Sequence, residues 1–139
     1  MKWWLIGVLS LLVALAGLPA SPASATECSL VGTYWRAVAI DGNPVTVPSN
    51  QREPHLKFNA DGKVNGSTGC NRLMGTYKLE GNKLQFSQMI TTKMACPQLG
   101  NLEQTFLQAV HATAAMRISG KTLELKDAAG KVVMRLEAR

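Results

Sequence analysis

The sequence has few of the residues from which catalytic and metal sites are built. Its 139 residues include two histidines and three cysteines, which form neither the C-x2-C nor the H-x3-H spacing of zinc sites. It contains no phosphate-binding loop, no dinucleotide-binding glycine motif and no G-x-S-x-G motif. We therefore expect no catalytic residue, no cofactor and no metal ion.

The charged residues also exclude one class of partner. Fifteen Lys and Arg residues outnumber nine Asp and Glu residues, for a formal net charge of +6. The basic residues are scattered singly and form no stripe of the kind that binds nucleic acid, so we expect no nucleic-acid partner. The acidic residues Asp41, Asp61 and Asp127 stand in turns, where an Asp side chain caps its own backbone. The positive excess favours solubility, with some attraction to anionic lipid or polysaccharide.

The N-terminal segment has the three parts of a secretory signal peptide. Lys2 precedes an apolar stretch over residues 3–18, which is shorter than the roughly 20 residues of a spanning helix. Prolines follow, and Ala23-Ser24-Ala25 provides small residues at both recognition positions. We predict that residues 1–25 are removed, that residues 26–139 form a single domain, and that no membrane-spanning segment remains. The product would be periplasmic or secreted.

Most of the remaining chain alternates between apolar and polar residues, with turn residues between the segments. Such alternation is typical of antiparallel hairpins with one buried and one exposed face. The predicted strands cover residues 33–40, 55–58, 76–80, 83–86, 122–126 and 132–136. Residues 43–53, which contain two prolines, are predicted to form an exposed loop.

Residues 97–115 break this alternation and predict an amphipathic helix. Apolar residues recur there at helical spacing, and polar residues lie opposite them. Pro97 suits the first turn of a helix, where the missing N–H costs nothing. We expect the helix to cover an open end or face of the sheet, with Phe106 buried and His111 in solvent.

The three cysteines allow one favoured disulfide. An exported chain meets an oxidising compartment, where a suitably placed pair closes. Cys70 and Cys96 each lie beside a turn-prone or irregular stretch, whereas Cys28 lies at the start of the predicted mature chain, where a partner is hardest to hold. We therefore favour a Cys70–Cys96 bond. The alternative is a redox or nucleophilic thiol at Cys70, which would need a basic partner. Glu27 argues against lipidation of Cys28, although a free, lipidated or intermolecularly paired Cys28 stays open.

Two polar, irregular stretches flank these cysteines and have two interpretations. In the first, their residues are structural, with glycines shaping the chain and Asn71 bonding to neighbouring backbone. In the second, they form a small recognition surface that the disulfide holds rigid. The candidates for that surface are Ser67, Thr68, Asn71, Arg72, Thr91, Thr92 and Lys93.

Several motifs occur in the order found in one known family. They are Leu30-Val31-Gly32-Thr33-Tyr34-Trp35, Gly66-x-x-Gly69-Cys70-Asn71 followed by Gly75-x-Tyr77, Thr91-Thr92-Lys93-Met94-Ala95-Cys96, Glu103-x-x-Phe106 and Leu123-x-Leu125-x-Asp127-x-x-Gly130. Together they resemble the META domain family, which includes HslJ-like heat-inducible envelope proteins, and the resemblance extends from Leu30 to about Leu136. It implies a small barrel-like antiparallel sheet with one helix packed against it. It also implies that Cys70 and Cys96 belong together.

The resemblance brings no catalytic residues, but it associates the family with envelope stress and with heat or antibiotic tolerance. We therefore expect a monomeric, non-enzymatic exported domain that binds a protein or cell-envelope component. The alternative is a carrier of an apolar small molecule, since small barrels can hold one ligand inside. A cysteine-based enzyme stands third.

Overall fold

The structure is a computed structural model of the chain that describes residues 16–17 and 27–139. The predicted signal peptide therefore lies outside the described residues, except for residues 16 and 17. Among the described helices, none combines the length and apolar character needed to cross a bilayer.

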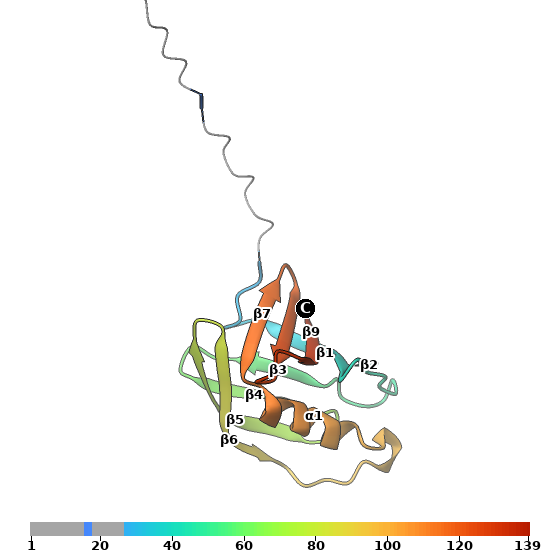
Figure 1. Cartoon of the computed structure of the whole chain (residues 1–139). Helices are drawn as coiled ribbons and strands as arrows, with labels where there is room; N and C mark the ends of the chain where they lie inside the picture. The colour runs from blue at the N-terminus through green and yellow to red at the C-terminus, as the bar shows by residue number, and fades with distance from the viewer. Residues whose placement is uncertain (1–15, 18–26) are drawn as a thin grey trace, which may run out of the picture.

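One antiparallel sheet of nine strands forms most of the fold, and β1 also pairs with β9, which closes the sheet into a ring (Figure 1). In chain order the elements are β1 Tyr34–Ile40, β2 Asn43–Pro44, β3 His55–Phe58, β4 Lys63–Ser67, β5 Arg72–Glu80, β6 Lys83–Thr91, a 3-10 turn Pro97–Leu99, α1 Leu102–Ala112, β7 Ala115–Ser119, β8 Thr122–Lys126 and β9 Val132–Ala138. The predicted mostly β fold, with a barrel-like sheet and one packed helix, is confirmed.

The ring is weakest between β6 and β7. These strands pair only at Lys83 and Ala115, whereas β5 and β6 pair along most of their length. The helix α1 connects the two strands and packs mainly against β9 and β1 (Figure 1). It buries Phe106 and Val110 in the core and leaves His111 exposed, as predicted.

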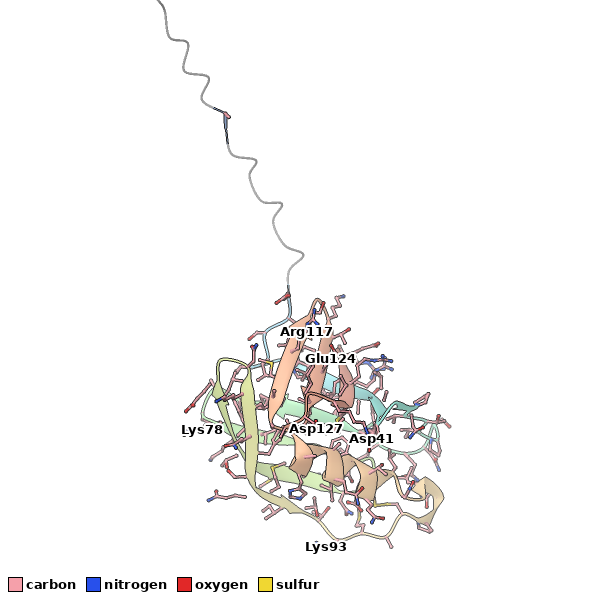
Figure 2. All side chains as sticks on the ribbon, in the orientation of Figure 1. Asp41, Lys78, Lys93, Arg117, Glu124 and Asp127 are labelled. Carbon is pink, nitrogen blue, oxygen red and sulfur yellow. A yellow bond between two sulfur atoms is a disulfide. The ribbon has the colours of Figure 1, made fainter. Side chains whose placement is uncertain are left out.

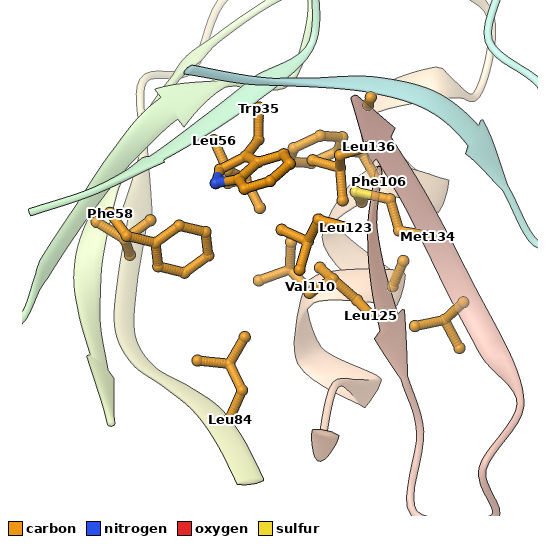
Figure 3. Packing of buried hydrophobic residues seen from close by; sticks show 14 of the residues in the cluster. Trp35, Leu56, Phe58, Leu84, Phe106, Val110, Leu123, Leu125, Met134 and Leu136 are labelled. Carbon is orange, nitrogen blue, oxygen red and sulfur yellow. The ribbon is translucent and has the colours of Figure 1, made fainter. Parts of the chain in front are cut away.

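Side chains from opposite strands fill the inside of the ring (Figure 3). Trp35, Leu56, Phe58, Leu84 and Leu123 are all fully buried. The indole nitrogen of Trp35 donates a hydrogen bond of 3.0 Å to the carbonyl of Leu30. This bond joins the start of the described domain to its core.

The sequence predictions for four segments need correction. The helix begins at Leu102, because Gly100 has a φ of 58° and separates it from the preceding 3-10 turn. It ends at Ala112, because Thr113 is extended, with a ψ of 126°, and leads through Ala114 into the unpredicted strand β7. The strand β4 was also missed, and the short strand β2 interrupts the predicted loop at residues 43–53.

Cys28 is better held than its position in the sequence suggested. Its backbone N–H donates a hydrogen bond of 3.0 Å to the carbonyl of Gly120. Its side chain is half-buried and packs against the core. The expectation that the chain is poorly held at Cys28 is therefore wrong.

Candidate functional site

The connection between β4 and β5 is fixed to the segment before α1 by a disulfide. Cys70 and Cys96 are bonded with their Cα atoms 5.8 Å apart, as predicted. Cys70 is buried, and the bond leaves no free thiol there. In the part of the chain that the structure describes, Cys28 is the free cysteine.

The side chain of Asn71, which follows Cys70, also joins the β4–β5 connection to the segment before α1. Its Oδ1 accepts hydrogen bonds from the Thr92 hydroxyl (2.9 Å) and the Met94 backbone N–H (2.7 Å). Its Nδ2 donates to the Met94 carbonyl (3.1 Å) and to Glu103 Oε1 (2.7 Å). A side-chain amide has two donor hydrogens and two acceptor positions, so Asn71 is fully satisfied.

Glu103 connects this network to the first turn of α1. Its Oε1 also accepts a hydrogen bond of 3.0 Å from the Thr68 hydroxyl. That hydroxyl accepts a bond of 2.9 Å from the Asn71 backbone N–H. The carboxylate thus binds two buried side chains of the β4–β5 connection. Sequence reasoning placed Glu103 only in a helix motif and missed this role.

The structure divides the predicted recognition surface into two groups. Ser67, Thr68 and Asn71 are buried, with exposed fractions of 2%, 0% and 2%. They bond to neighbouring backbone and to Glu103, so the prediction that they form a surface is wrong and the structural interpretation holds for them. Arg72, Thr92 and Lys93 are exposed, and Thr91 is half-buried. Lys93 lies in the loop before α1 (Figure 2).

Two large apolar side chains stand exposed on the neighbouring strands. Met74 of β5 and Ile90 of β6 are directly paired, with exposed fractions of 55% and 64%. Asn65 of β4 pairs with Met74 on the other side, and Lys57 of β3 pairs with Asn65. These four exposed residues form one row across the outer surface of the sheet.

A groove with a volume of about 450 Å³ lies along this row. We call it the outer groove; it is lined by Asn59, Lys63, Val64, Asn65, Met74, Gly75, Thr76, Gln88 and Ile90. None of these nine residues belongs to the predicted recognition surface, because the groove depends on register and backbone shape that the sequence pattern did not reveal.

A β-bulge shapes the groove. The β5–β6 register shifts between Met74 and Thr76, and Gln88 of β6 has a φ of 53°. A Cβ atom on Gly75 would lie only 3.1 Å from the Ser87 carbonyl oxygen and 3.2 Å from the Met89 Cα, both backbone atoms of β6. Glycine at position 75 therefore allows the two strands to approach at the bulge. Bulges often re-aim side chains next to functional sites, and here Gln88 joins the groove lining.

A charged cluster beside Tyr34, which pairs with Lys57 at the end of the same row, holds the end of the predicted loop. The Tyr34 hydroxyl donates a hydrogen bond of 3.0 Å to Glu53, and Arg139 contacts the same carboxylate oxygen at 2.8 Å. Arg36 lies 3.5 Å from its other oxygen. Burial, followed by the hydrogen bond to Glu53, raises the pKa of Tyr34 to about 12. Because these charges neutralise one another, the cluster is best explained as structural.

A ring-like antiparallel sheet, one packed helix, and a disulfide beside the buried Asn71 and its partner Glu103 define a small β-rich domain. The sequence model of the META domain family matches residues 28–139. The chain belongs to the META domain family.

Solved structures agree with this assignment. The chain is similar to a protein solved by NMR, with 27% identity and a TM-score of 0.60, over 76% of this chain and 87% of the other. It is also similar to a protein from Burkholderia xenovorans solved by NMR, with 25% identity and a TM-score of 0.63, over 88% and 99%. A DUF4847 family protein from Bacteroides vulgatus shares the fold at 17% identity and a TM-score of 0.51, over 60% and 57%. No functionally curated protein matches the chain.

Proposed function

We propose that this protein is a non-enzymatic exported domain that binds a protein or another cell-envelope component and contributes to stress or antibiotic tolerance. The observation that carries the proposal is the outer groove, where Met74 and Ile90 are exposed side by side. Apolar side chains gathered at one place on a surface mark binding sites, whereas singly scattered ones do not.

The family motifs support a scaffold role for the residues around the disulfide. Asn71 has its full complement of hydrogen bonds, and Cys70 is bonded to Cys96. A nucleophile or general base needs a free, accessible group. These residues are engaged in holding β4, β5 and α1 together, which favours binding over catalysis.

Binding at the surface also fits the protein better than carriage of an apolar molecule inside the ring. Trp35, Phe58, Leu84 and Phe106 converge on the middle of the ring and are fully buried (Figure 3). Carriers of small molecules keep an interior space for the ligand. Here large side chains occupy that position, while the outer groove is open to a partner.

Export is part of the proposal and has its own test. The predicted signal sequence and the Cys70–Cys96 bond both fit an oxidising compartment. We expect mass spectrometry of the periplasmic or secreted fraction to find a mature chain that begins at Thr26. A chain that keeps residues 1–25, or that carries acyl groups on Cys28, would contradict this part.

The tolerance role is tested by deletion and complementation in the cells that make the protein. We expect the deletion to lower survival under heat or antibiotic challenge, and the wild-type protein to restore it. The variant Ile90→Asp should not restore survival at equal protein level. Gln85→Asp is the matched control, because it places the same carboxylate at an exposed position of β6 outside the groove. Unchanged survival of the deletion strain would contradict the tolerance role.

A further inference from the structure

We propose that the outer groove binds an extended peptide segment of another protein in which apolar side chains stand next to acidic ones. This inference rests on the proposed function and names the partner's chemistry and the surface that receives it. Three properties of the groove lead to it: its apolar pair, the hydrogen-bonding groups left free on its amides, and its positive charge.

The apolar pair provides the contact for the partner's apolar side chains. Met74 and Ile90 lie opposite each other on adjacent strands, and both are largely exposed. Directly opposite residues of paired strands have Cβ atoms about 4.5–5.5 Å apart, so one apolar side chain can touch both. Methionine adapts its shape to such a partner because its side chain is unbranched and flexible.

The amides of the groove offer partners for a peptide backbone. Asn59 Nδ2 donates a hydrogen bond of 2.9 Å to Asn65 Oδ1. Among the described residues this is the only side-chain hydrogen bond of the pair, and the Gln88 side chain makes none. The side-chain Oδ1 of Asn59 and the Nδ2 of Asn65 are thus available as an adjacent acceptor and donor. A peptide backbone presents the complementary N–H and C=O groups along its length.

The charge around the groove selects acidic side chains. Lys63 lines the groove, while Lys57 and Arg72 flank it on β3 and β5; we call these three residues the basic rim. All three are exposed, and none belongs to an ion pair within the described part of the chain. No Asp or Glu lines the groove. Asp61, in the turn before β4, is the nearest acidic residue along the chain to Lys63, and its carboxylate accepts a hydrogen bond from the Lys63 backbone N–H. The three basic side chains outnumber it, so a carboxylate on the partner would meet net positive charge, which steers and orients association.

The other possible occupants fit these features less well. A second copy would bring its own basic rim against this one, and like charges at an interface are costly. Residues 1–25 of the chain contain no Asp or Glu, so they provide no carboxylate. The hydrocarbon layer of a membrane offers no hydrogen-bond partner to the amides of Asn59, Asn65 and Gln88 that line the groove, whereas an extended peptide backbone does.

The test is direct binding of defined probes to the purified full protein, measured by fluorescence anisotropy and NMR. The first probe is a short synthetic peptide in which Glu and Val alternate, and the second carries Lys in place of Glu. We expect the Glu–Val peptide to bind and to shift the resonances of the outer groove. Added salt should weaken binding, because the rim is solvent-exposed. The Lys–Val peptide should not bind.

Three variants sharpen the test, with unfolding temperatures measured to show that each is folded. Ile90→Asp and Lys63→Glu should each raise the dissociation constant of the Glu–Val peptide about tenfold. This is the effect of losing one interface contact of about 1.4 kcal/mol. Lys63→Glu should gain binding to the Lys–Val peptide. Gln85→Asp should leave both results unchanged.

Several outcomes would overturn the proposal. They are no binding of the Glu–Val peptide, equal binding of both peptides, or binding that Ile90→Asp leaves intact. Attachment of the protein to vesicles of phosphatidylcholine and phosphatidylglycerol without peptide binding would assign the groove to a membrane surface instead. If the Glu–Val peptide does not bind, but Ile90→Asp still abolishes retention of the protein by the cell-envelope fraction, the proposed function stands and this inference alone is wrong.

Discussion

Asn71 Nδ2 donates a hydrogen bond of 2.7 Å to Glu103 Oε1, joining the β4–β5 connection to the first turn of α1. Asn71 is almost completely buried, with 2% of its surface exposed. A hydrogen bond to a charged group contributes more to stability than one between neutral groups. This pair thus explains why an asparagine and a glutamate occur in separate motifs of the same small domain.

Replacement of Asn71 by alanine should lower the free energy of unfolding by about 1–3 kcal/mol, because the partners at Thr92, Met94 and Glu103 lose their bonds. Urea unfolding measures this. Asn65→Ala is the control, since Asn65 is exposed, and it should change stability little. Equal effects of the two substitutions would mean that the buried network adds nothing.

The isosteric substitution Asn71→Asp gives this prediction a second readout. It removes both donors and places a second carboxylate beside Glu103. Two neighbouring carboxylates disfavour each other's ionisation. The variant should therefore be most destabilised at neutral pH and should recover part of its stability as the pH falls. A loss of stability that does not depend on pH would contradict the close contact with Glu103.

Removal of the disulfide by Cys70→Ala with Cys96→Ala should lower the free energy of unfolding by about 2–5 kcal/mol, the range found for native disulfides of small domains. Thermal unfolding of the oxidised protein and the double variant measures the difference. Non-reducing peptide mapping of the exported protein checks the pairing, and a crosslink of Cys28 to Cys70 or Cys96 would refute it.

The helix packs through Phe106, which is fully buried, and presents His111 to solvent. Phe106→Ala should destabilise the protein by about 3–5 kcal/mol, the usual range for a core aromatic. His111→Ala should be close to neutral in the same denaturation experiment. Similar losses for the two variants would show that the helix faces the core differently.

Tyr34 should make stability depend on alkaline pH. Its pKa is raised from 10.0 to about 12, first by burial and then by the hydrogen bond to Glu53. A raised native pKa means that the folded state keeps a proton that the unfolded state loses. The stabilisation is thus fully present below pH 10 and is lost as the pH rises toward about 12. Tyr34→Phe should reduce this decline in denaturation curves, and an unchanged decline would contradict it.

The sequence predicted the strands whose side chains alternate clearly, but it missed β2, β4 and β7. β4 contains Lys63, Asn65 and Gly66, which favour strands little. It forms because β3 and β5 pair with it on both sides. A Cβ atom at Gly66 would collide with the His55 carbonyl, so this position needs glycine. β7 was hidden because its first residue continues the helical pattern of α1.

The site was less predictable because it depends on contacts between distant residues. The sequence singled out Asn71, but its partner Glu103 lies 32 residues further along the chain. Local pattern therefore could not distinguish a surface asparagine from a buried one. The outer groove was missed for a related reason: Met74 and Ile90 become neighbours only through the β5–β6 register.

The central claim is that the motif residues build the scaffold, whereas the outer groove binds the partner. Its most direct test is the fraction of purified protein retained by the cell-envelope fraction, measured for Ile90→Asp, Asn71→Ala and Gln85→Asp under conditions in which all three are folded. We predict that Ile90→Asp loses retention, while Asn71→Ala and Gln85→Asp keep the wild-type value. Full retention of the Ile90→Asp variant would contradict the claim. So would a result in which only the Asn71→Ala variant loses retention.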